Sequence, residues 1–213
     1  MIGYNPHIKR CIDFFLSLLA ILWLAPFLVV ISILICIDSK GSPFFIQERF
    51  GRGVVPFKLI KFRSMAFDGF DESGGFNPGD SRRVTKIGRL LRKTKIDELP
   101  ELFNILKGDM SFVGPRPEVD KYVNAYLRDF QVILIVRPGL SDFASIKYRD
   151  EEQILADKTD PEKYYRNVIL PDKLQIARNY VDKISLKMDL AIIRNTLKSV
   201  MGVFNTRINE YEN

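Results

Sequence analysis

The chain has 213 residues, of which 46% are hydrophobic and 27% are charged, a composition typical of one folded domain with at most a small appendage. Its two cysteines cannot form a disulfide scaffold or a four-ligand zinc site, and its single histidine excludes multi-histidine metal chemistry. The formal net charge of +6 indicates an anionic partner: nucleic acid, lipid headgroups or a phosphorylated substrate.

The first element in chain order is an apolar segment from Phe14 to Ile37. Its 24 residues carry no charge, and 17 of them are Leu, Ile, Val or Phe. As a helix it would be about 36 Å long, enough to cross a hydrocarbon core of about 30 Å. The core helix of a soluble protein rarely lacks a polar face over this length. A cleaved signal peptide would need a small-residue cleavage site, and none follows. We therefore expect a membrane anchor.

Whether this segment crosses the membrane or turns back depends on Pro26 and on the flanks. Pro26 lacks an N–H group and clashes with the carbonyl four residues earlier, so it kinks or breaks a helix. Both flanks are basic, with Lys9 and Arg10 before the segment and Lys40 and Arg49 after it, and basic flanks stay on the cytoplasmic side. A kinked hairpin satisfies both flanks, whereas a straight span leaves one outside. Because proline also occurs in spanning helices, the residues alone leave both forms open.

The remaining chain is predicted to form short strands and helices. Extended segments over 44–62 surround a tight turn at Gly51-Arg52-Gly53, and the Gly- and Asp-rich stretch over 67–81 predicts a loop. Asp97 is expected to cap a helix that ends at Gly108. Helices are predicted over residues 84–91, 98–106, 171–183 and 185–204.

The last predicted helix carries an apolar stripe at helical spacing. Such a stripe is most often a core face, and next to a membrane anchor it is also suited to the lipid interface. Its members are Leu186, Leu190, Ile193, Leu197, Met201 and Phe204.

The densest group of charges lies between Arg89 and Glu101, where basic residues are followed by the carboxylates Asp97, Glu98 and Glu101. Helix capping and weak surface ion pairs would explain this group without a function. The functional interpretation is a phosphate site, in which Mg2+ relieves the repulsion between carboxylates and a nucleotide diphosphate. Two adjacent acids then allow one to act as a nucleophile and the other as a metal ligand.

Basic residues are concentrated between Lys40 and Lys95, with 13 Lys or Arg against 5 Asp or Glu. Such a surface would also suit a non-enzymatic membrane scaffold that binds lipids or nucleic acid. A polyanion-binding surface has no use for an acidic pair, however, and no nucleic-acid-binding module is recognisable, so we expect no nucleic-acid partner. A P-loop ATPase is excluded because its Gly-rich motif is absent.

Three motifs resemble those of the bacterial sugar transferase family, the small monotopic polyprenyl-phosphate glycosyl-1-phosphate transferases. The resemblance covers nearly the whole chain, from Lys9-Arg10 to Asp189-Leu190. The motifs are Lys61-Phe62-Arg63-Ser64-Met65, the run from Lys93 to Pro117 that contains Asp97-Glu98-Leu99-Pro100 and Gly114-Pro115-Arg116-Pro117, and Arg137-Pro138-Gly139.

This resemblance implies transfer of a sugar-1-phosphate from a UDP-sugar to undecaprenyl phosphate with release of UMP, the first membrane step of surface glycan biosynthesis. The family's aspartate, matching Asp97, forms a phospho-aspartyl intermediate, and its glutamate, matching Glu98, helps to hold Mg2+. Both carboxylates are thus candidate metal ligands. The resemblance also implies substrate-binding roles, with Arg116 at a nucleotide-phosphate contact; these residues are Lys61, Arg63, Arg92, Pro115, Arg116, Pro117, Arg137 and Asp189.

The implied architecture is an α+β, mainly helical fold at the cytoplasmic face of the bacterial inner membrane. Residues 1–38 are expected to form a Pro-broken re-entrant membrane helix in contact with inner-membrane lipid. Residues 39–213 are expected to form a small cytoplasmic catalytic domain with interfacial amphipathic helices. The chain departs from many relatives after Arg137-Pro138-Gly139, where they have Thr-Gly and Ala-Gln and it has a different loop over 140–149, so the sugar stays open. Lys95 replaces a residue that is often small in relatives.

Overall fold

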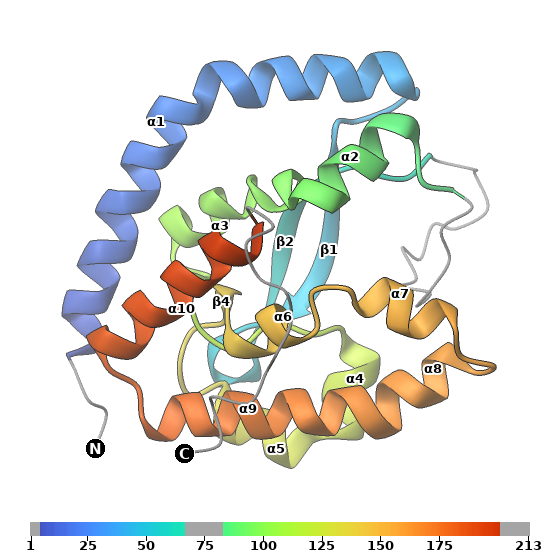
Figure 1. The fold of residues 1–213 in the computed structure, drawn as a ribbon. Coiled ribbons are helices and arrows are strands. Elements are labelled where there is room, and N and C mark those ends of the chain that lie inside the picture. The colour runs from blue at the N-terminus through green and yellow to red at the C-terminus, as the bar shows by residue number, and fades with distance from the viewer. Residues whose placement is uncertain (1–4, 67–82, 201–213) are drawn as a thin grey trace.

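The computed structural model describes residues 5–66 and 83–200, which form a mixed α/β fold made mainly of helices, as expected (Figure 1). The predicted loop over 67–81 and the stripe positions Met201 and Phe204 lie outside the described residues. The helices are α1 (Pro6–Asp38), α2 (Lys86–Thr94), α3 (Glu101–Lys107), α4 (Asp120–Ala125), α5 (Leu127–Ile133), α6 (Phe143–Lys147), α7 (Glu151–Ala156), α8 (Pro161–Tyr164), α9 (Leu170–Asp182) and α10 (Leu186–Val200). The strands are β1 (Phe44–Phe50), β2 (Pro56–Phe62), β3 (Ser111–Val113) and β4 (Gly139–Ser141). The shorter segments are the 3-10 turns η1 (Arg52–Val54) and η2 (Ile96–Glu98) and the π-helical η3 (Tyr165–Ile169).

The long apolar helix α1 contains Pro26 and is bent into two arms that wrap around one side of the molecule (Figure 1). The expected break is therefore a bend within one continuous helix. A proline removes only one N–H donor, so hydrogen bonds on either side of it keep the helix going while the clash with the preceding turn bends it. By length and composition α1 is the one helix of the described chain that is able to cross a membrane.

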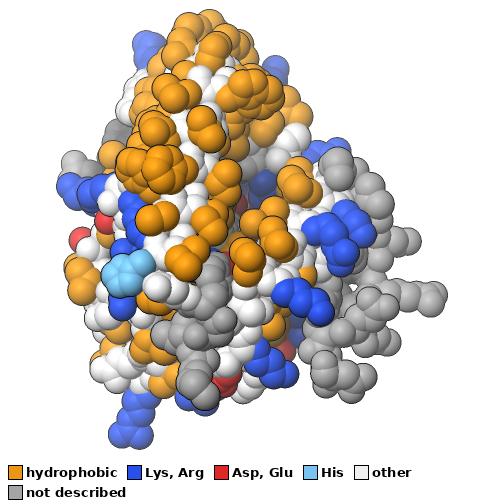
Figure 2. Space-filling view, turned by 90° about the vertical axis from the view of Figure 1, so that its left-hand side faces the viewer, with side chains coloured by type: hydrophobic (Ala, Val, Ile, Leu, Met, Phe, Trp, Pro, Cys, Tyr) orange, Lys and Arg blue, Asp and Glu red, His pale blue; other side chains and the backbone are white. Residues whose placement is uncertain are grey.

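One face of α1 packs on the rest of the protein, and the other is exposed. Leu28, Ile31 and Ile35 lie against Phe62 and Leu91, and residues nearer the N-terminus contact a second small core under α3. Figure 2 shows hydrophobic side chains covering the outer surface of this part of the molecule. The exposed ones on α1 include Phe15, Leu19, Leu22, Trp23, Val29, Ile33 and Ile37.

Both ends of α1 are bonded to the same folded unit. At the start, Lys9 forms an ion pair with Asp189, and Arg10 donates to the carbonyl of Ile105 over 2.6 Å. At the other end, the carboxylate of Asp38 accepts a hydrogen bond from the backbone N–H of Ile87 over 3.1 Å. Because α1 is bent, both of its ends contact the same folded unit.

The predicted extended segments form the antiparallel hairpin β1–β2, with Phe44 opposite Phe62 and Phe50 opposite Pro56. Helix α3 is docked onto this hairpin by Asn104, whose side chain accepts from the N–H of Ile60 and donates to the carbonyl of Lys58. This link sets the distance between β2 and the turn that precedes α3.

A parallel pair, β3 and β4, brings two loops together. Ser111 pairs with Gly139, and Val113 pairs with Ser141. A Cβ atom on Gly139 would lie 2.1 Å from the backbone nitrogen of Gly114, so the two loops touch backbone to backbone only because this position is glycine. The Gly114–Pro117 and Arg137–Gly139 motifs are therefore neighbours in space.

The largest hydrophobic core lies beneath this pair and is built mainly by α4, α5, η3 and α9, with Ile192 from α10. The predicted helices over 171–183 and 185–204 are confirmed as α9 and α10, the latter described as far as Val200. The core alternative for the apolar stripe is wrong at Leu186, Leu190 and Leu197, which are exposed, because α10 turns a polar face inward. The buried polar residues of α10 are Asp189, Asn195 and Ser199.

Candidate active site

Four of the predicted site residues meet in one partly buried cluster, which we call the charge cluster: Lys61, Asp97, Glu98 and Arg116. The Oε1 atom of Glu98 lies 2.8 Å from Nζ of Lys61 and 2.7 Å from Nη2 of Arg116. The Nζ atom of Lys61 also lies 3.2 Å from Oε1 of Glu101, a residue to which the motifs assign no role. Three segments far apart in the sequence thus place two cations on one carboxylate.

Each member of the charge cluster stands at the end of a short element. Lys61 is near the end of β2, Asp97 and Glu98 lie in η2, and Arg116 follows β3. The turn from α2 into η2 runs through Lys95, whose φ of 59° lies in the left-handed region. Non-glycine residues seldom adopt this conformation, which reverses the chain here so that the two acids enter the site.

The expected role of Asp97 as a helix N-cap is wrong. Asp97 lies inside η2, and α3 begins only at Glu101, with Pro100 as the N-cap residue. The backbone N–H groups of Glu98 and Leu99 bond three residues back, which is the tighter 3-10 winding. Since its carboxylate is not used in capping, Asp97 is left with a buried Oδ1 atom that has no hydrogen-bond partner among the described residues.

The two acids of the pair have opposite pKa shifts. Burial alone would raise the pKa of Glu98, but the charges of Arg116 and Lys61 outweigh it and hold that pKa well below its usual value. Burial and the neighbouring charge of Glu98 raise the pKa of Asp97, and Lys61, Lys95 and Arg92 offset only part of this. Glu98 is therefore a fixed anion, whereas Asp97 is the more basic carboxylate.

Glu101 is the third carboxylate of the site and is 2% exposed. Burial raises its pKa to about 7, with a further contribution from Glu98, against the lowering effect of Lys61. Burial would lower the pKa of Lys61, but Glu98 and Glu101 raise it above its usual value, so this lysine stays charged. The sequence signal for Glu101 was its position three residues after Glu98. In the structure both glutamates lie near the same cation, Lys61.

Arg92 contributes to the field at Asp97 from the last turn of α2. Its Nε atom donates to the hydroxyl of Ser64 over 3.1 Å, and its Nη1 atom lies 2.8 Å from Oε1 of Glu152 in α7. A Cβ atom on Gly88 would lie 2.0 Å from the carbonyl oxygen of Ser64, so α2 approaches this segment closely at a glycine. Arg92 is thus held at the edge of the site by two partners.

Three predicted substrate-binding residues have their described contacts elsewhere. Arg63 donates to the carbonyls of Ser39 and Lys40 at the end of α1, and Arg137 donates to the carbonyl of Gly108 over 2.8 Å. Asp189 is buried beside Lys9 and accepts a hydrogen bond from Tyr180 over 2.8 Å. Each of these residues ties α1 or α3 to the fold.

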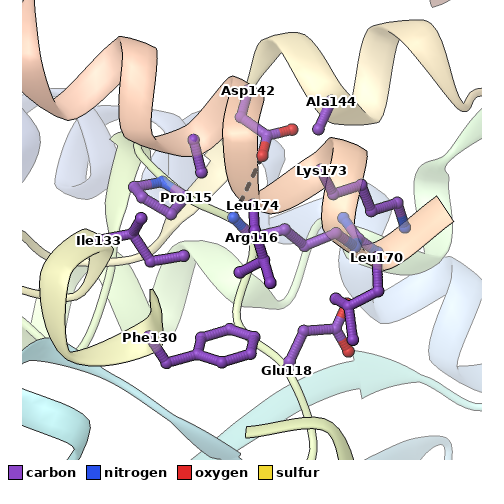
Figure 3. A pocket seen from close by; sticks show the side chains of 11 residues that line it. Pro115, Arg116, Glu118, Phe130, Ile133, Asp142, Ala144, Leu170, Lys173 and Leu174 are labelled. Carbon is purple, nitrogen blue, oxygen red and sulfur yellow. Dashed lines mark hydrogen bonds between the residues drawn. The ribbon is translucent and has the colours of Figure 1, made fainter. Parts of the chain in front are cut away.

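Pro115 and Arg116 border a small cavity, and Figure 3 shows Asp142 and Lys173 among the other side chains that line it. The cavity holds about 20 Å³, which is enough for a single water molecule and far too little for a nucleotide. The backbone N–H of Arg116 donates to Oδ2 of Asp142 over 3.2 Å, the dashed line of Figure 3. The cavity is therefore part of the support behind Arg116.

Behind this loop lies a second buried group that the sequence did not reveal. Glu118 accepts a hydrogen bond from the hydroxyl of Tyr165 over 2.6 Å, and its other oxygen lies 3.3 Å from Nη1 of Arg49. Burial and the charge of Glu118 raise the pKa of Tyr165 well above its usual value. These partners come from β1 and η3, so no local spacing signals the contact.

The carboxylates suit a hard cation. Among residues 5–66 and 83–200 no group of three or more His, Cys, Asp or Glu is arranged to hold a metal ion. Mg2+ commonly takes only one or two carboxylates and completes its shell with substrate phosphates and water. The carboxylates of Asp97 and Glu98 are donors of the type that Mg2+ takes in this way, and the Oδ1 of Asp97 has no hydrogen-bond partner among the described residues.

A partly buried acidic–basic cluster in a fold with a bent apolar helix is what we expect of an enzyme that handles phosphates at a membrane surface. The family model described as bacterial sugar transferase matches residues 4–203, and the chain therefore belongs to the bacterial sugar transferase family.

Three relatives illustrate this kinship. A UDP-N-acetylgalactosamine-undecaprenyl-phosphate N-acetylgalactosaminephosphotransferase of Aeromonas hydrophila is 34% identical over 203 residues, 94% of this chain and 45% of the relative. A putative undecaprenyl-phosphate N-acetylgalactosaminyl 1-phosphate transferase of Bacillus subtilis is 48% identical over 111 residues, 52% of this chain and 62% of the relative. A UDP-glucose:undecaprenyl-phosphate glucose-1-phosphate transferase of Caulobacter vibrioides is 35% identical over 202 residues, 92% of this chain and 71% of the relative. The chain thus spans about half the length of the first and under two thirds of the second.

Proposed function

We propose that the protein transfers a sugar-1-phosphate from a UDP-sugar to undecaprenyl phosphate and releases UMP. The names of its relatives support this reaction. The observation that carries it is the state of Asp97: a buried carboxylate oxygen without a hydrogen-bond partner among the described residues, next to a glutamate whose charge is neutralised by Lys61 and Arg116. Such an oxygen is free to attack an electrophile.

The proposed chemistry has two displacements at one phosphorus atom. A carboxylate oxygen of Asp97 attacks the sugar-bearing phosphorus of the UDP-sugar, the bond to the bridging oxygen breaks, and UMP leaves. A phosphate oxygen of undecaprenyl phosphate then attacks the same phosphorus, the bond to Asp97 breaks, and its carboxylate is regenerated. The raised pKa of Asp97 makes its carboxylate a better nucleophile than that of an ordinary aspartate.

The surrounding cations stabilise the negative charge of both substrates. Arg116 and Lys61 hold Glu98 and present positive charge beside Asp97. We assign to Arg92 a contact with a donor phosphate, and to Pro115 and Pro117 the stiffening of the loop that carries Arg116. When bound, Mg2+ held by Asp97 and Glu98 would supply charge neutralisation at the diphosphate. For Arg63, Arg137 and Asp189 we propose support of the site through α1 and α3 instead of direct substrate contact.

We further propose that residues 1–38 form a re-entrant anchor and residues 39–213 the catalytic domain, on the cytoplasmic face of the inner membrane. The contacts of Lys9, Arg10 and Asp38 support this topology, since a straight span would separate the two ends of α1 by about 30 Å of hydrocarbon. The exposed stripe of α10 supports an interfacial position for that helix.

UMP release tests the activity. Full-length protein in lipid nanodiscs is incubated with undecaprenyl phosphate, Mg2+ and a panel of UDP-sugars, and UMP is measured. We expect turnover with at least one UDP-sugar and loss of at least about 1,000-fold in Asp97→Asn, since a covalent nucleophile is removed. Asp120→Asn, an exposed acid on α4, is the matched control and should be fully active. Wild-type protein that releases no UMP with any sugar would overturn the proposed activity, and an active Asp97→Asn would overturn the nucleophile.

Topology is tested by labelling. In a background with Cys11→Ser and Cys36→Ser, single cysteines at Asn5 and Phe45, both exposed, are treated with a membrane-impermeant maleimide. We expect both positions to react in inside-out vesicles and neither in intact spheroplasts. Reaction of position 5 in spheroplasts would mean that α1 spans the membrane.

A further inference from the structure

Asp142 joins two parts of the site that the motifs treat separately. Its side chain is buried, with 5% of the residue exposed. One oxygen, Oδ2, accepts a hydrogen bond from the backbone N–H of Arg116 over 3.2 Å, and the other, Oδ1, accepts one from the N–H of Ser145 over 2.6 Å. Each carboxylate oxygen therefore holds a different segment.

The hydrogen bond from the backbone N–H of Arg116 to Asp142 is important for the loop because of the residues on either side of Arg116. Pro115 and Pro117 have no N–H groups, so Arg116 supplies the only backbone donor of the Pro-Arg-Pro loop. Backbone hydrogen bonds already join the two neighbouring segments: the N–H of Gly114 donates to the carbonyl of Ser141 over 3.2 Å, and the carbonyl of Pro115 accepts from the N–H of Gly139 over 2.9 Å. The side chain of Asp142 adds one more hydrogen bond between these segments, and this bond holds the backbone N–H of Arg116, the only backbone donor of the loop.

The same carboxylate also acts on the guanidinium. Glu98 is the largest cause of the raised pKa of Arg116, and the negative charge of Asp142 adds to it. Figure 3 shows Asp142 and Arg116 on adjoining sides of the small cavity. The backbone bond and the charge therefore favour one placement of Arg116, with its Nη2 atom on Glu98.

We propose that Asp142 is a positioning residue for the reaction: it holds Arg116 in the orientation that pairs with Glu98 and faces the donor diphosphate. This inference rests on the proposed function for its kinetic readout. The alternative is that Asp142 only caps α6 through Ser145, a role that would affect folding and leave donor binding alone.

Asp142→Asn separates these two roles. Asparagine caps helices about as well as aspartate, so its amide oxygen is able to keep the bond from Ser145. The amide nitrogen then faces the N–H of Arg116, two donors meet, and the hold on the loop is lost. The matched control is Asp160→Asn, because Asp160 caps α8 through the N–H of Lys163 over 2.9 Å, is exposed and belongs to no part of the site.

In nanodiscs with Mg2+, we expect Asp142→Asn to lower kcat/KM for the UDP-sugar about tenfold, mostly through a higher KM, because a hydrogen bond to a charged group is lost. The KM for undecaprenyl phosphate should stay close to that of Asp160→Asn, whereas the midpoint of thermal unfolding should fall, because two buried donors then face each other. A donor KM in Asp142→Asn equal to that of the control would overturn the proposal.

A binding cycle with UDP as the probe makes the test independent of turnover. Calorimetry of wild type, Asp142→Asn, Arg116→Ala and the double variant should show that Asp142→Asn weakens UDP binding only when Arg116 is present. If Asp142→Asn weakens UDP binding as much in the Arg116→Ala background as in the wild type, Asp142 acts through the fold, which contradicts the proposal. If Asp142→Asn does not fold, Asp142→Ser, which also caps helices, goes through the same cycle. Absence of UMP release in the wild type would count against the proposed function, while this cycle would still decide the role of Asp142.

Discussion

The Nη2 atom of Arg116 lies 2.7 Å from Oε1 of Glu98, and Nζ of Lys61 lies 2.8 Å from the same oxygen. A single carboxylate oxygen thus contacts two cations, one from β2 and one from the loop after β3. Both cations pair with Glu98, and the neighbouring Asp97 forms no ion pair with either of them in the described structure. The two acids therefore have different surroundings: Glu98 is paired with both cations, and Asp97 keeps a buried oxygen without a hydrogen-bond partner among the described residues.

Removing the charge of Glu98 should leave buried cations without their partner. We expect Glu98→Gln to lower the free energy of unfolding by about 2–3 kcal/mol, less than a fully broken buried pair costs because Glu101 remains beside Lys61. UMP release should fall at least about 100-fold. Thermal unfolding and UMP assays measure both effects.

A double variant checks the cause of that loss. Lys61→Met together with Glu98→Gln should regain part of the stability, because a buried charge is removed with its partner, and should stay inactive. Glu48→Gln, at an exposed position on β1, is the control and should change neither quantity. Glu98→Gln protein as stable as the wild type would contradict the role of Glu98 as the shared anion.

The raised pKa of Asp97 predicts the acid side of the pH profile. Asp97 reacts in its deprotonated form, so kcat/KM should fall as pH drops through this pKa, above the pH at which an ordinary aspartate with a pKa of about 3.9 would titrate. Lys95 lowers this pKa, so Lys95→Gln should move the acid limb to higher pH.

Because Lys95 is exposed, salt should screen its influence and shrink the difference between the two profiles. Lys93→Gln removes an equivalent exposed charge from α2 and serves as the control. Profiles are recorded at fixed Mg2+. An acid limb in Lys95→Gln that is unmoved, or moved to lower pH, would count against Asp97 as the titrating nucleophile.

Parts of this arrangement were predictable from sequence, because they depend on local signals. The hairpin follows from two extended segments around Gly51-Arg52-Gly53, and α9 and α10 follow from helical periodicity. The proximity of Lys61, Asp97, Glu98 and Arg116 was implied by the family motifs. The 3-10 turn at Asp97 was not predicted, because an acid before Glu98-Leu99-Pro100 is equally typical of a helix N-cap.

The remaining features depend on contacts between distant residues. The β3–β4 pair joins segments of three residues each, too short for any periodic pattern. Glu118 meets Tyr165 across 47 positions, and Asp142 meets Arg116 across 26. The inward polar face of α10 is visible only once Asp189 is seen to pair with Lys9. Hydrophobic periodicity predicts that a helix forms but does not indicate which of its faces packs on the rest of the protein.

Glu101 should make stability depend on pH. Its folded pKa of about 7 lies above the usual 4.5, so folding favours the protonated form: this contribution is fully present below about pH 4.5 and is lost as pH rises through 7. Glu101→Gln has no such loss and should be more stable than the wild type at pH 8, by on the order of 1–3 kcal/mol.

At pH 5 the wild-type residue is mostly protonated and resembles glutamine, so the two proteins should unfold at nearly the same temperature. Thermal unfolding from pH 5 to pH 8 without divalent cations measures the difference. A gap that is constant across this range would show that Glu101 does not titrate there.

Glu152 should compete with the donor for Arg92. The ion pair between Nη1 of Arg92 and Oε1 of Glu152 is 2.8 Å long and largely exposed on the side of Glu152, so it is worth about 0–1 kcal/mol. If Arg92 binds a donor phosphate, Glu152→Gln frees it and should lower the KM for the UDP-sugar by about two- to fivefold. Asp150→Asn removes a neighbouring charge at the start of α7 and should leave the KM unchanged. A higher KM in Glu152→Gln would instead place Glu152 in direct contact with the donor.

The exposed stripe of α10 should meet lipid. Leu190 is 58% exposed and Leu197 is 57% exposed, although both are large apolar side chains. In the cysteine-free background, an environment-sensitive dye is attached at either position, and its emission is compared between protein in lipid nanodiscs and protein kept soluble by amphipol without lipid. The emission should be shifted to the blue in nanodiscs, because the dye enters the headgroup boundary. Lys187, an exposed position on the same helix, provides the control dye site, whose emission should change little. Equal shifts at positions 187, 190 and 197 would mean that α10 does not turn its apolar stripe toward the membrane, and the anchor would then consist of α1 alone.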